Sequence, residues 1–364
     1  MNLRKHLCFT TYFFSYLVGS SSWKPVKTNS VLRFITFQNV IPAVIRNMIF
    51  GTIFLSCTFW RLKLFVLHVN IIRSVFILCT LSVPFIVLLN STLVLMYRLV
   101  HTNMLNKLIF MIEGSSSKKC ADVFERNFHI IQILSIIVVF ASLATLDFSR
   151  NALEDLFSYT FFECLLLWTV LDKINILLLT LKLLKNLTEN TKKSDLLTVV
   201  ESCKQHLKIK GMMKLYGTIN RWFFLCLSVY AFVWVTYNLH KFIVLHFFDY
   251  KKFPTRSFTI SAISTWLWTS LQLFHLASII LTYHKISEAD EIFRSSVRDT
   301  FTKLDLSEKY SNIYVIRKIE IYFKRTPTTY QAVMLSLEPH LLLKIIGTCI
   351  TYLLILATFE ANSK

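Results

Sequence analysis

Residues 341–359 read LLLKIIGTCITYLLILATF, a stretch that is mostly aliphatic but contains three threonines and a tyrosine. A helix of nineteen residues rises about 28 Å, close to the roughly 30 Å thickness of the hydrocarbon core of a bilayer. At about 100° per residue, Thr351 and Thr358 lie nearly one above the other, and Thr348 and Tyr352 lie beside them. The stretch therefore predicts a membrane-crossing helix with one polar stripe.

The remainder of the 364-residue chain has the same character. It is 54% hydrophobic, contains 32 Phe and 14 Tyr, and has only 6 Gly and 6 Pro, whereas soluble domains are about 45–50% apolar. Its apolar residues gather in runs long enough to cross a membrane. We predict an all-α membrane protein with seven transmembrane helices, at residues 34–60, 71–100, 130–146, 159–184, 222–248, 258–283 and 341–359. Pro42 and Arg46 interrupt the first of these segments, so a start near Ala43 is the alternative.

The positive charge of the chain predicts its orientation. The net charge is +19, and 30 of the 40 Lys and Arg residues lie in stretches on the same side as the N-terminus, against 9 on the other side. Because basic residues favour cytoplasmic loops, we expect a multi-pass plasma-membrane protein with a cytoplasmic N-terminus and an extracellular C-terminus. Residues 7–22 resemble a signal peptide, but hydroxyl-bearing residues dilute their apolar region, and a cytoplasmic segment is favoured.

Two polar stretches, 185–221 and 285–340, keep apolar residues at helical spacing. We expect them to be helical extensions that pack on one another as a cytoplasmic anchor domain; helices lying on anionic lipid are the alternative. The predicted division is a cytoplasmic N-terminal segment at 1–33, helices one to six at 34–284, anchor helices at 285–340, and the last helix with a short extracellular tail at 341–364.

The sequence contains no pattern that favours an enzyme, a metal site, a cofactor or a nucleic-acid partner. Its eight cysteines are scattered without a CxxC pair, its ten histidines form no HExxH motif, and there is no zinc-finger spacing. G-protein-coupled receptors have the opposite orientation, and transporter-like repeats are not visible. The intramembrane charges Glu163, Asp172 and Lys173 are candidates for function or for pairing within the helix bundle.

The chain resembles the insect gustatory receptors, which belong to the same superfamily as the insect odorant receptors. The family pattern in the last helix is Thr-Tyr, five apolar residues and Gln-Phe, and it stands here as Thr351-Tyr352, LLILA and Thr358-Phe359. The stretches NKLIFMIEG (106–114) and KLYGTINRWFF (214–224) also resemble the family at the expected places. Thr358 replaces the family glutamine, so the resemblance implies that this protein differs from its relatives at this position.

This resemblance implies a gustatory receptor: a tetrameric, ligand-gated, non-selective cation channel, formed with identical or related subunits and opened by a small organic tastant. The aromatic residues favour a bitter or deterrent compound. An odorant-receptor-like protein, or a receptor or transporter without a pore, is the alternative. The candidate pore-lining residues are Thr348, Thr351, Tyr352, Ile355, Thr358 and Phe359. The alternative for these threonines is that their hydroxyls only bond to carbonyls of their own helix.

The candidate ligand-binding residues are aromatic and polar side chains in the predicted outer halves of segments four to six. Aromatic walls with a few polar groups suit a small organic ligand. The same residue types also anchor helices at membrane interfaces or fill a bundle, so packing is the alternative. The candidates are Tyr159, Phe162, Glu163, Trp168, Trp234, Tyr237, Asn238 and Trp266.

Overall fold

The computed structural model describes eleven stretches of the chain, which contain eight helices and four short strands. They are residues 23–28, 31–36, 41–67, 71–113, 161–192, 196–243, 255–303, 313–325, 331–332, 335–336 and 339–362. The third predicted segment, 130–146, lies outside these stretches.

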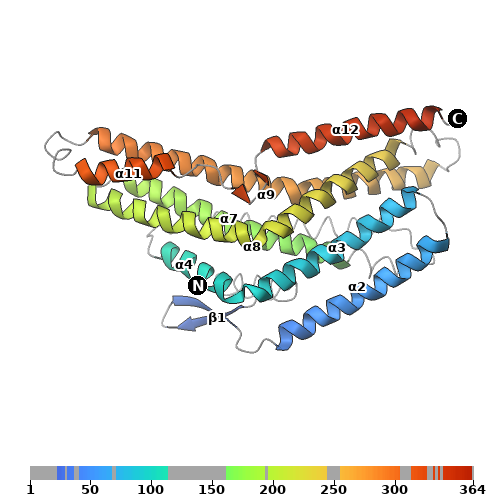
Figure 1. Cartoon of the computed structure of the whole chain (residues 1–364), viewed down its shortest axis with the longest axis horizontal. Helices are drawn as coiled ribbons and strands as arrows, with labels where there is room; N and C mark the ends of the chain where they lie inside the picture. Colours follow the sequence, from blue (N-terminus) through green and yellow to red (C-terminus); the bar gives the residue numbers. More distant parts are fainter. Residues whose placement is uncertain are drawn as a thin grey trace.

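Three long helices form the centre of the molecule (Figure 1): α7 (Phe161–Lys192), α8 (Leu196–Ile243) and α9 (Thr255–Lys303). Each combines a predicted apolar segment and a predicted polar stretch in one uninterrupted helix, with the polar part first in α8 and last in α7 and α9. Their sequences contain no proline, so no backbone hydrogen bond of the helix interior is lost to a proline. Apolar and polar residues therefore lie on the same continuous rods.

A second layer consists of α2 (Ile41–Leu67), α3 (Ile71–Met96) and α4 (Arg98–Glu113), which lie along one side of α7 and α8 (Figure 1). The first predicted segment, 34–60, begins later than residue 34, since α2 begins at Ile41, close to the alternative start near Ala43. Pro42 is compatible with this start, because the first turn of a helix needs no backbone donor there.

The prediction of one helix over 71–100 is also wrong at its end. The chain turns at Tyr97, and α4 leaves α3 at 79°. Backbone bonds from Tyr97 N to Leu93 O (3.0 Å) and from His101 N to Tyr97 O (2.9 Å) hold the two sides of this bend. The bend occurs where the apolar run gives way to Arg98, His101 and Thr102, so the more polar α4 takes a different direction from α3.

The fold is mostly helical, in agreement with the predicted fold class, and two short strand pairs accompany the helices. Strands β1 (Trp23–Thr28) and β2 (Val31–Thr36) pair antiparallel, with Thr28 opposite Val31. Two residues separate these partners, which is the commonest hairpin loop length, and Val, Ile, Phe and Thr in these strands favour extended backbone. A smaller hairpin, β3 (Gln331–Ala332) with β4 (Leu335–Ser336), precedes the last helix.

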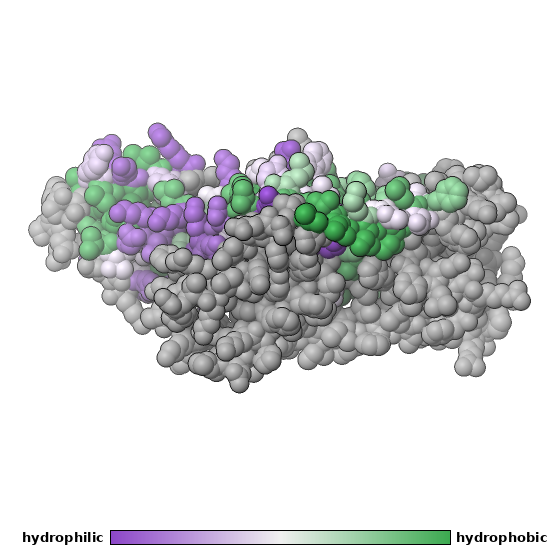
Figure 2. Space-filling view, turned by 90° about the horizontal axis from the view of Figure 1, so that it is seen from below, coloured by the Kyte–Doolittle hydropathy of each residue, from purple (hydrophilic) through white to green (hydrophobic). Residues whose placement is uncertain are grey.

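The C-terminal part adds α11 (Ile313–Arg325), beside the end of α9, and α12 (Pro339–Asn362), at the opposite end of the molecule (Figure 1). The predicted helix 341–359 falls inside α12. Pro339 occupies the first position of α12, where its fixed φ favours helix initiation. Seen from below, hydrophilic residues gather at the end of the molecule that carries α11, and hydrophobic residues lie nearer the middle (Figure 2).

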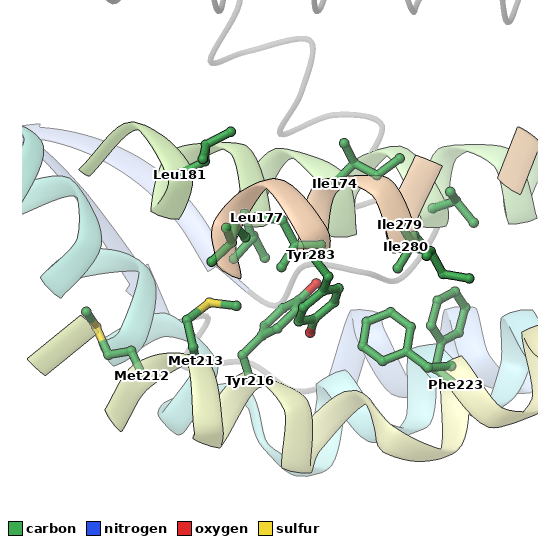
Figure 3. Packing of buried hydrophobic residues seen from close by; sticks show 14 of the residues in the cluster. Ile174, Leu177, Leu181, Met212, Met213, Tyr216, Phe223, Ile279, Ile280 and Tyr283 are labelled. Atoms are coloured by element: carbon green, nitrogen blue, oxygen red, sulfur yellow. The ribbon is translucent and has the colours of Figure 1, made fainter. Parts of the chain in front are cut away.

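One hydrophobic core joins α3, α7, α8 and α9. Leu177 of α7, Tyr216 and Phe223 of α8, and Ile280 of α9 are fully buried in it and point toward one another (Figure 3). Full burial of one such side chain contributes about 1.5–3 kcal/mol. The core fixes the relative positions of the three long helices and so of every polar group between them.

Among the described residues, one helix has the length and apolar character needed to cross a membrane, Leu196–His240 of α8; the bent pair of α3 and α4 would be a second. The seven-span topology and the sides of the two termini therefore remain predictions from the sequence.

Candidate functional site

A buried carboxylate lies at the point where the three long helices meet. Glu163 is in the first turn of α7, where the helix dipole favours negative charge, and it is only 2% exposed. It accepts a hydrogen bond from the hydroxyl of Tyr230 on α8 and another, at 3.1 Å, from the amide of Gln272 on α9. One side chain therefore joins α7, α8 and α9 through polar contacts.

Gln272 extends this arrangement into a chain of hydrogen bonds. Its Oε1 lies 3.3 Å from Nδ1 of His275, and both side chains are fully buried. Because an amide oxygen can only accept, His275 donates from Nδ1, which makes its Nε2 an acceptor in the neutral ring. Nε2 has no hydrogen-bond partner within the described stretches. The polar chain thus ends on an acceptor that a ligand hydroxyl or a water molecule could satisfy.

Aromatic rings on α8 border this polar chain. Tyr230 and Trp234 stack with centroids 6.1 Å apart and ring planes at 26°, and Trp234 lies 5.7 Å from Tyr237 at 32°. Spacings of four and three residues put these rings on one face of the helix. Trp234 is buried, while Tyr237 is half-buried. Stacked rings beside a short polar chain can hold a small aromatic molecule and orient its polar group.

The structure brings some of the predicted ligand-site residues together and separates others. Phe162, Glu163, Trp234 and Asn238 are buried, and Trp168 and Tyr237 are half-buried. Trp266 is 54% exposed, so it is not part of this buried group. Tyr159 lies outside the described residues.

The sequence reasoning missed Tyr230, Gln272 and His275. Tyr230 could have been found from its spacing of four residues to Trp234. Gln272 and His275 could have been found as polar residues inside an apolar segment, one helical turn apart.

The threonines of α12 form an exposed stripe. Thr348, Thr351 and Thr358 each donate to a carbonyl four residues earlier, at 2.7, 3.0 and 2.9 Å. Tyr352 is 51% exposed and Ile355 is 45% exposed. The described part of this chain therefore leaves the stripe uncovered, and in the single chain the hydroxyls are satisfied within their own helix. The side chain of Phe359 lies outside the described residues.

The other face of α12 holds it against α8. Cys349 and Leu353 are buried, and the hydroxyl of Thr236 lies 3.2 Å from the Cys349 sulfur. Tyr352 lies at the border between this face and the exposed stripe, and one side of its ring meets that of Phe232 edge-on at 6.1 Å. Residues four apart share a helix face, so Cys349 and Leu353 form one contact stripe. The remaining faces of α12 expose Leu343, Ile350 and Leu354. Such an apolar helix suits a second copy of the chain or lipid as its neighbour.

A second polar cluster lies in the extensions of α8 and α9, outside the predicted spans. Asp290 on α9 contacts His206 and, at 3.4 Å, Lys210, both on α8, and Arg294 one turn along α9 at 3.1 Å. Arg294 also donates to the carbonyl of Phe323 at 2.8 Å, in the last turn of α11. This bond satisfies one of the carbonyls that a helix end leaves unpaired. The cluster therefore fastens α11 to α8 and α9.

The charges in this cluster are set by burial and by one another. Burial alone would raise the pKa of the Asp290 carboxyl, but its hydrogen bond with His206 and the charges of His206, Lys210 and Arg294 lower that pKa below 3.8. Burial, together with the charges of Arg294 and Lys210, lowers the pKa of His206 below 6.5 despite the neighbouring Asp290. Asp290 is therefore ionised at neutral pH.

Comparison with solved structures relates the whole fold to known proteins. The insect olfactory receptor OR5 from Machilis hrabei, in complex with eugenol, matches with a TM-score of 0.68 over 97% of this chain and 99% of that chain, at 10% sequence identity. A second structure of OR5 matches with a TM-score of 0.65 over 96% of this chain and 98% of that chain, at 11% identity. The chain therefore has the fold of an insect olfactory receptor.

No protein-family model matches the chain, and no curated protein matches it significantly by sequence.

Proposed function

We propose that this chain is a chemosensory receptor of the gustatory type, in which a small organic ligand opens a non-selective cation channel. The likeness to an insect olfactory receptor over nearly the full length of both chains carries this proposal. The gustatory assignment rests on the Thr-Tyr, five apolar residues and Thr-Phe pattern of the last helix. The protein would be a multi-pass protein of the plasma membrane, with a cytoplasmic N-terminus and an extracellular C-terminus.

The ligand would bind beside Glu163, where α7, α8 and α9 meet. Tyr230 and Trp234 would supply stacking surface, and the chain from Glu163 through Gln272 to His275 would supply polar contacts. The site combines hydrogen-bonding groups with a strongly aromatic border, which favours a small aromatic compound that carries a hydroxyl over a sugar. The structure of the olfactory receptor in complex with eugenol is in keeping with such a ligand class.

The ion path would run along α12. Four copies of the exposed stripe would form a ring of hydroxyl groups, and the apolar faces beside it would contact neighbouring subunits or lipid. The hydroxyls of Thr351 and Thr358 would keep their bonds to their own helix and still offer an oxygen to hydrated cations. A receptor or transporter without a pore is the competing function.

Recording from cells that express the chain, alone or with related subunits, tests this function. We expect at least one compound in a panel of small aromatic tastants to evoke a cation current. Glu163→Gln keeps the size of the side chain but removes its charge, and we expect it to reduce sensitivity to that compound about tenfold or more. The matched control is Glu189→Gln, on the exposed surface of the same helix, which should leave the response unchanged. Ligand binding without any current in every subunit combination would favour the pore-less alternative.

A further inference from the structure

The charged and uncharged parts of α8 and α9 meet at one level of the molecule. The stretch 222–240 of α8 contains no Asp, Glu, Lys or Arg, and neither does the stretch 257–283 of α9. The ring of Phe224 meets that of Tyr283 edge-on at 5.9 Å, so the start of the first stretch and the end of the second lie side by side. In a membrane protein, uncharged runs that stop at the same level on two packed helices mark the boundary between hydrocarbon and water.

Across this level, α8 has one face that the described part of the chain leaves uncovered. The exposed side chains on this face are Lys214, Arg221, Trp222, Leu225 and Val229. At about 100° per residue, they lie within roughly 100° of one another around the helix axis. α8 runs from the end of the molecule that carries α11 toward the end that carries α12 (Figure 1), so the two basic residues precede the three apolar ones along it.

The positive charges on this face are not neutralised by the described residues. α8 contains no acidic residue in the stretch 202–243, and Lys214 and Arg221 form no ion pair within the described stretches. The guanidinium of Arg221 lies over the ring of Trp222, 5.1 Å from its centroid. This cation–π contact holds the guanidinium beside the ring and leaves N–H groups at its edge available to an acceptor.

These features fit an anionic phospholipid. Its phosphate would accept hydrogen bonds from Lys214 and Arg221, whose long side chains can extend along the helix toward a headgroup. Its acyl chain would lie along Leu225 and Val229, with Trp222 at the level between headgroup and hydrocarbon, where tryptophan is enriched. An acidic protein segment would pair with the two charges but would not cover the apolar residues. A lipid without net charge would cover the apolar residues but would leave the positive charge uncompensated.

We propose that the exposed face of α8, formed by Lys214, Arg221, Trp222, Leu225 and Val229, binds one anionic phospholipid. The lipid compensates the two positive charges and covers the three apolar side chains. This site rests on the membrane location proposed above, but it requires neither channel activity nor the ligand site at Glu163. Each basic residue should favour an anionic lipid over one without net charge about fivefold.

Quenching of tryptophan fluorescence by brominated lipids tests the site in the purified full-length chain in detergent. Phosphatidylglycerol and phosphatidylcholine, each brominated near the head of the acyl chains, are added to the micelles in separate titrations. We expect half-maximal quenching at a mole fraction of phosphatidylglycerol at least about fivefold lower than that of phosphatidylcholine. Equal mole fractions for the two lipids would overturn the proposal.

Two sets of variants and a control assign this preference to α8. Lys214→Gln combined with Arg221→Gln removes both charges and should abolish the preference. Trp222→Phe should remove the part of the quenching that distinguishes the two lipids, and it provides the answer if the double variant does not fold. Lys204→Gln, in the polar part of α8 and with a side chain that is 67% exposed, should keep the full preference. A preference that persists unchanged in both the double variant and Trp222→Phe contradicts the site.

The membrane location has a separate readout. The chain should stay in the membrane fraction of expressing cells after a wash with alkaline carbonate. Loss from that fraction would refute the membrane location and the lipid site together. A chain that stays in the membrane fraction but is quenched equally by the two lipids would refute the lipid site alone.

Discussion

At the scale of single residues, the hydroxyl of Tyr230 has a role that is separable from its ring. It donates to the buried carboxylate of Glu163, while the ring stacks on Trp234. Tyr230→Phe keeps the stacking and removes the donor, so it should cost about 1–3 kcal/mol, the usual cost when a buried acceptor loses its partner. The measurement is the melting temperature in detergent, which should fall by at least about 2 °C.

Tyr314→Phe is the matched control for this prediction. Tyr314 is 75% exposed on α11, so loss of its hydroxyl should leave the melting temperature unchanged. If Tyr230→Phe and Tyr314→Phe have the same melting temperature, the hydrogen bond to Glu163 contributes nothing to stability.

His206 should make the stability of the extensions depend on pH. Its pKa in the folded chain is lowered by burial, whereas in the unfolded chain it titrates near 6.5. Below pH 6.5 the unfolded chain therefore binds a proton that the folded chain does not, and acidification favours unfolding. The lowered pKa of Asp290 acts in the same direction, but only near and below pH 3.8. The melting temperature should therefore fall as the pH is lowered from 7.5 to 5.5.

Substitution of the histidine isolates this effect. His206→Gln removes the titrating ring and should make the fall between pH 7.5 and 5.5 smaller than in the wild-type chain. His284→Gln, at an exposed position of α9, should keep the wild-type slope. An identical slope in His206→Gln and in the wild type would refute the assignment.

At the scale of elements, Arg294 supplies a polar attachment of α11 to α9. Arg294 pairs with Asp290 and donates to the carbonyl of Phe323, while Ile319 and Phe323 supply the apolar contact. Arg294→Met keeps the apolar stem of the side chain but removes its ion pair with Asp290 and its hydrogen bond to Phe323. The buried negative charge of Asp290 then has one positive charge fewer beside it. Removal of one partner of a buried ion pair costs about 3–5 kcal/mol. Hydrogen exchange in residues 313–325 should become at least tenfold faster.

Arg298→Met, one turn further along α9 and exposed, is the control and should leave exchange in α11 unchanged. Unaltered exchange in Arg294→Met would mean that the apolar contacts of Ile319 and Phe323 hold α11 by themselves.

At the scale of the whole molecule, the hydrophobic pattern of the sequence predicted where the helices lie along the chain, but not how they pack against one another. The predicted helix at 341–359 lies inside α12, because a long aliphatic run is a strong signal. The bend at Tyr97 was missed, since helix ends depend on a few residues with weak preferences. Phe34, Ile35 and Thr36 suit a β-strand as well as a helix, and the structure places them in β2.

The polar contacts could not be read from the sequence, because they join distant residues. Tyr230 and Gln272 lie 67 and 109 positions from Glu163. Only the packing of α7, α8 and α9 brings them together. Glu163 itself was recognisable as a charge inside an apolar segment, a position where an ionised group needs partners. The sequence thus indicates that Glu163 needs hydrogen-bond donors, but only the fold shows that Tyr230 and Gln272 supply them.

The most direct test of the proposed channel is thiol modification at Thr351. In the stripe of α12, Thr351→Cys would place a reactive sulfur in the ion path, and Thr351 is exposed in the single chain. In cells that give a ligand-evoked cation current, a charged thiol reagent should block the current of Thr351→Cys, faster in the presence of ligand. The wild-type chain controls for native cysteines such as Cys349, which is buried against α8. A current that persists unaltered after complete modification would show that α12 does not line the ion path.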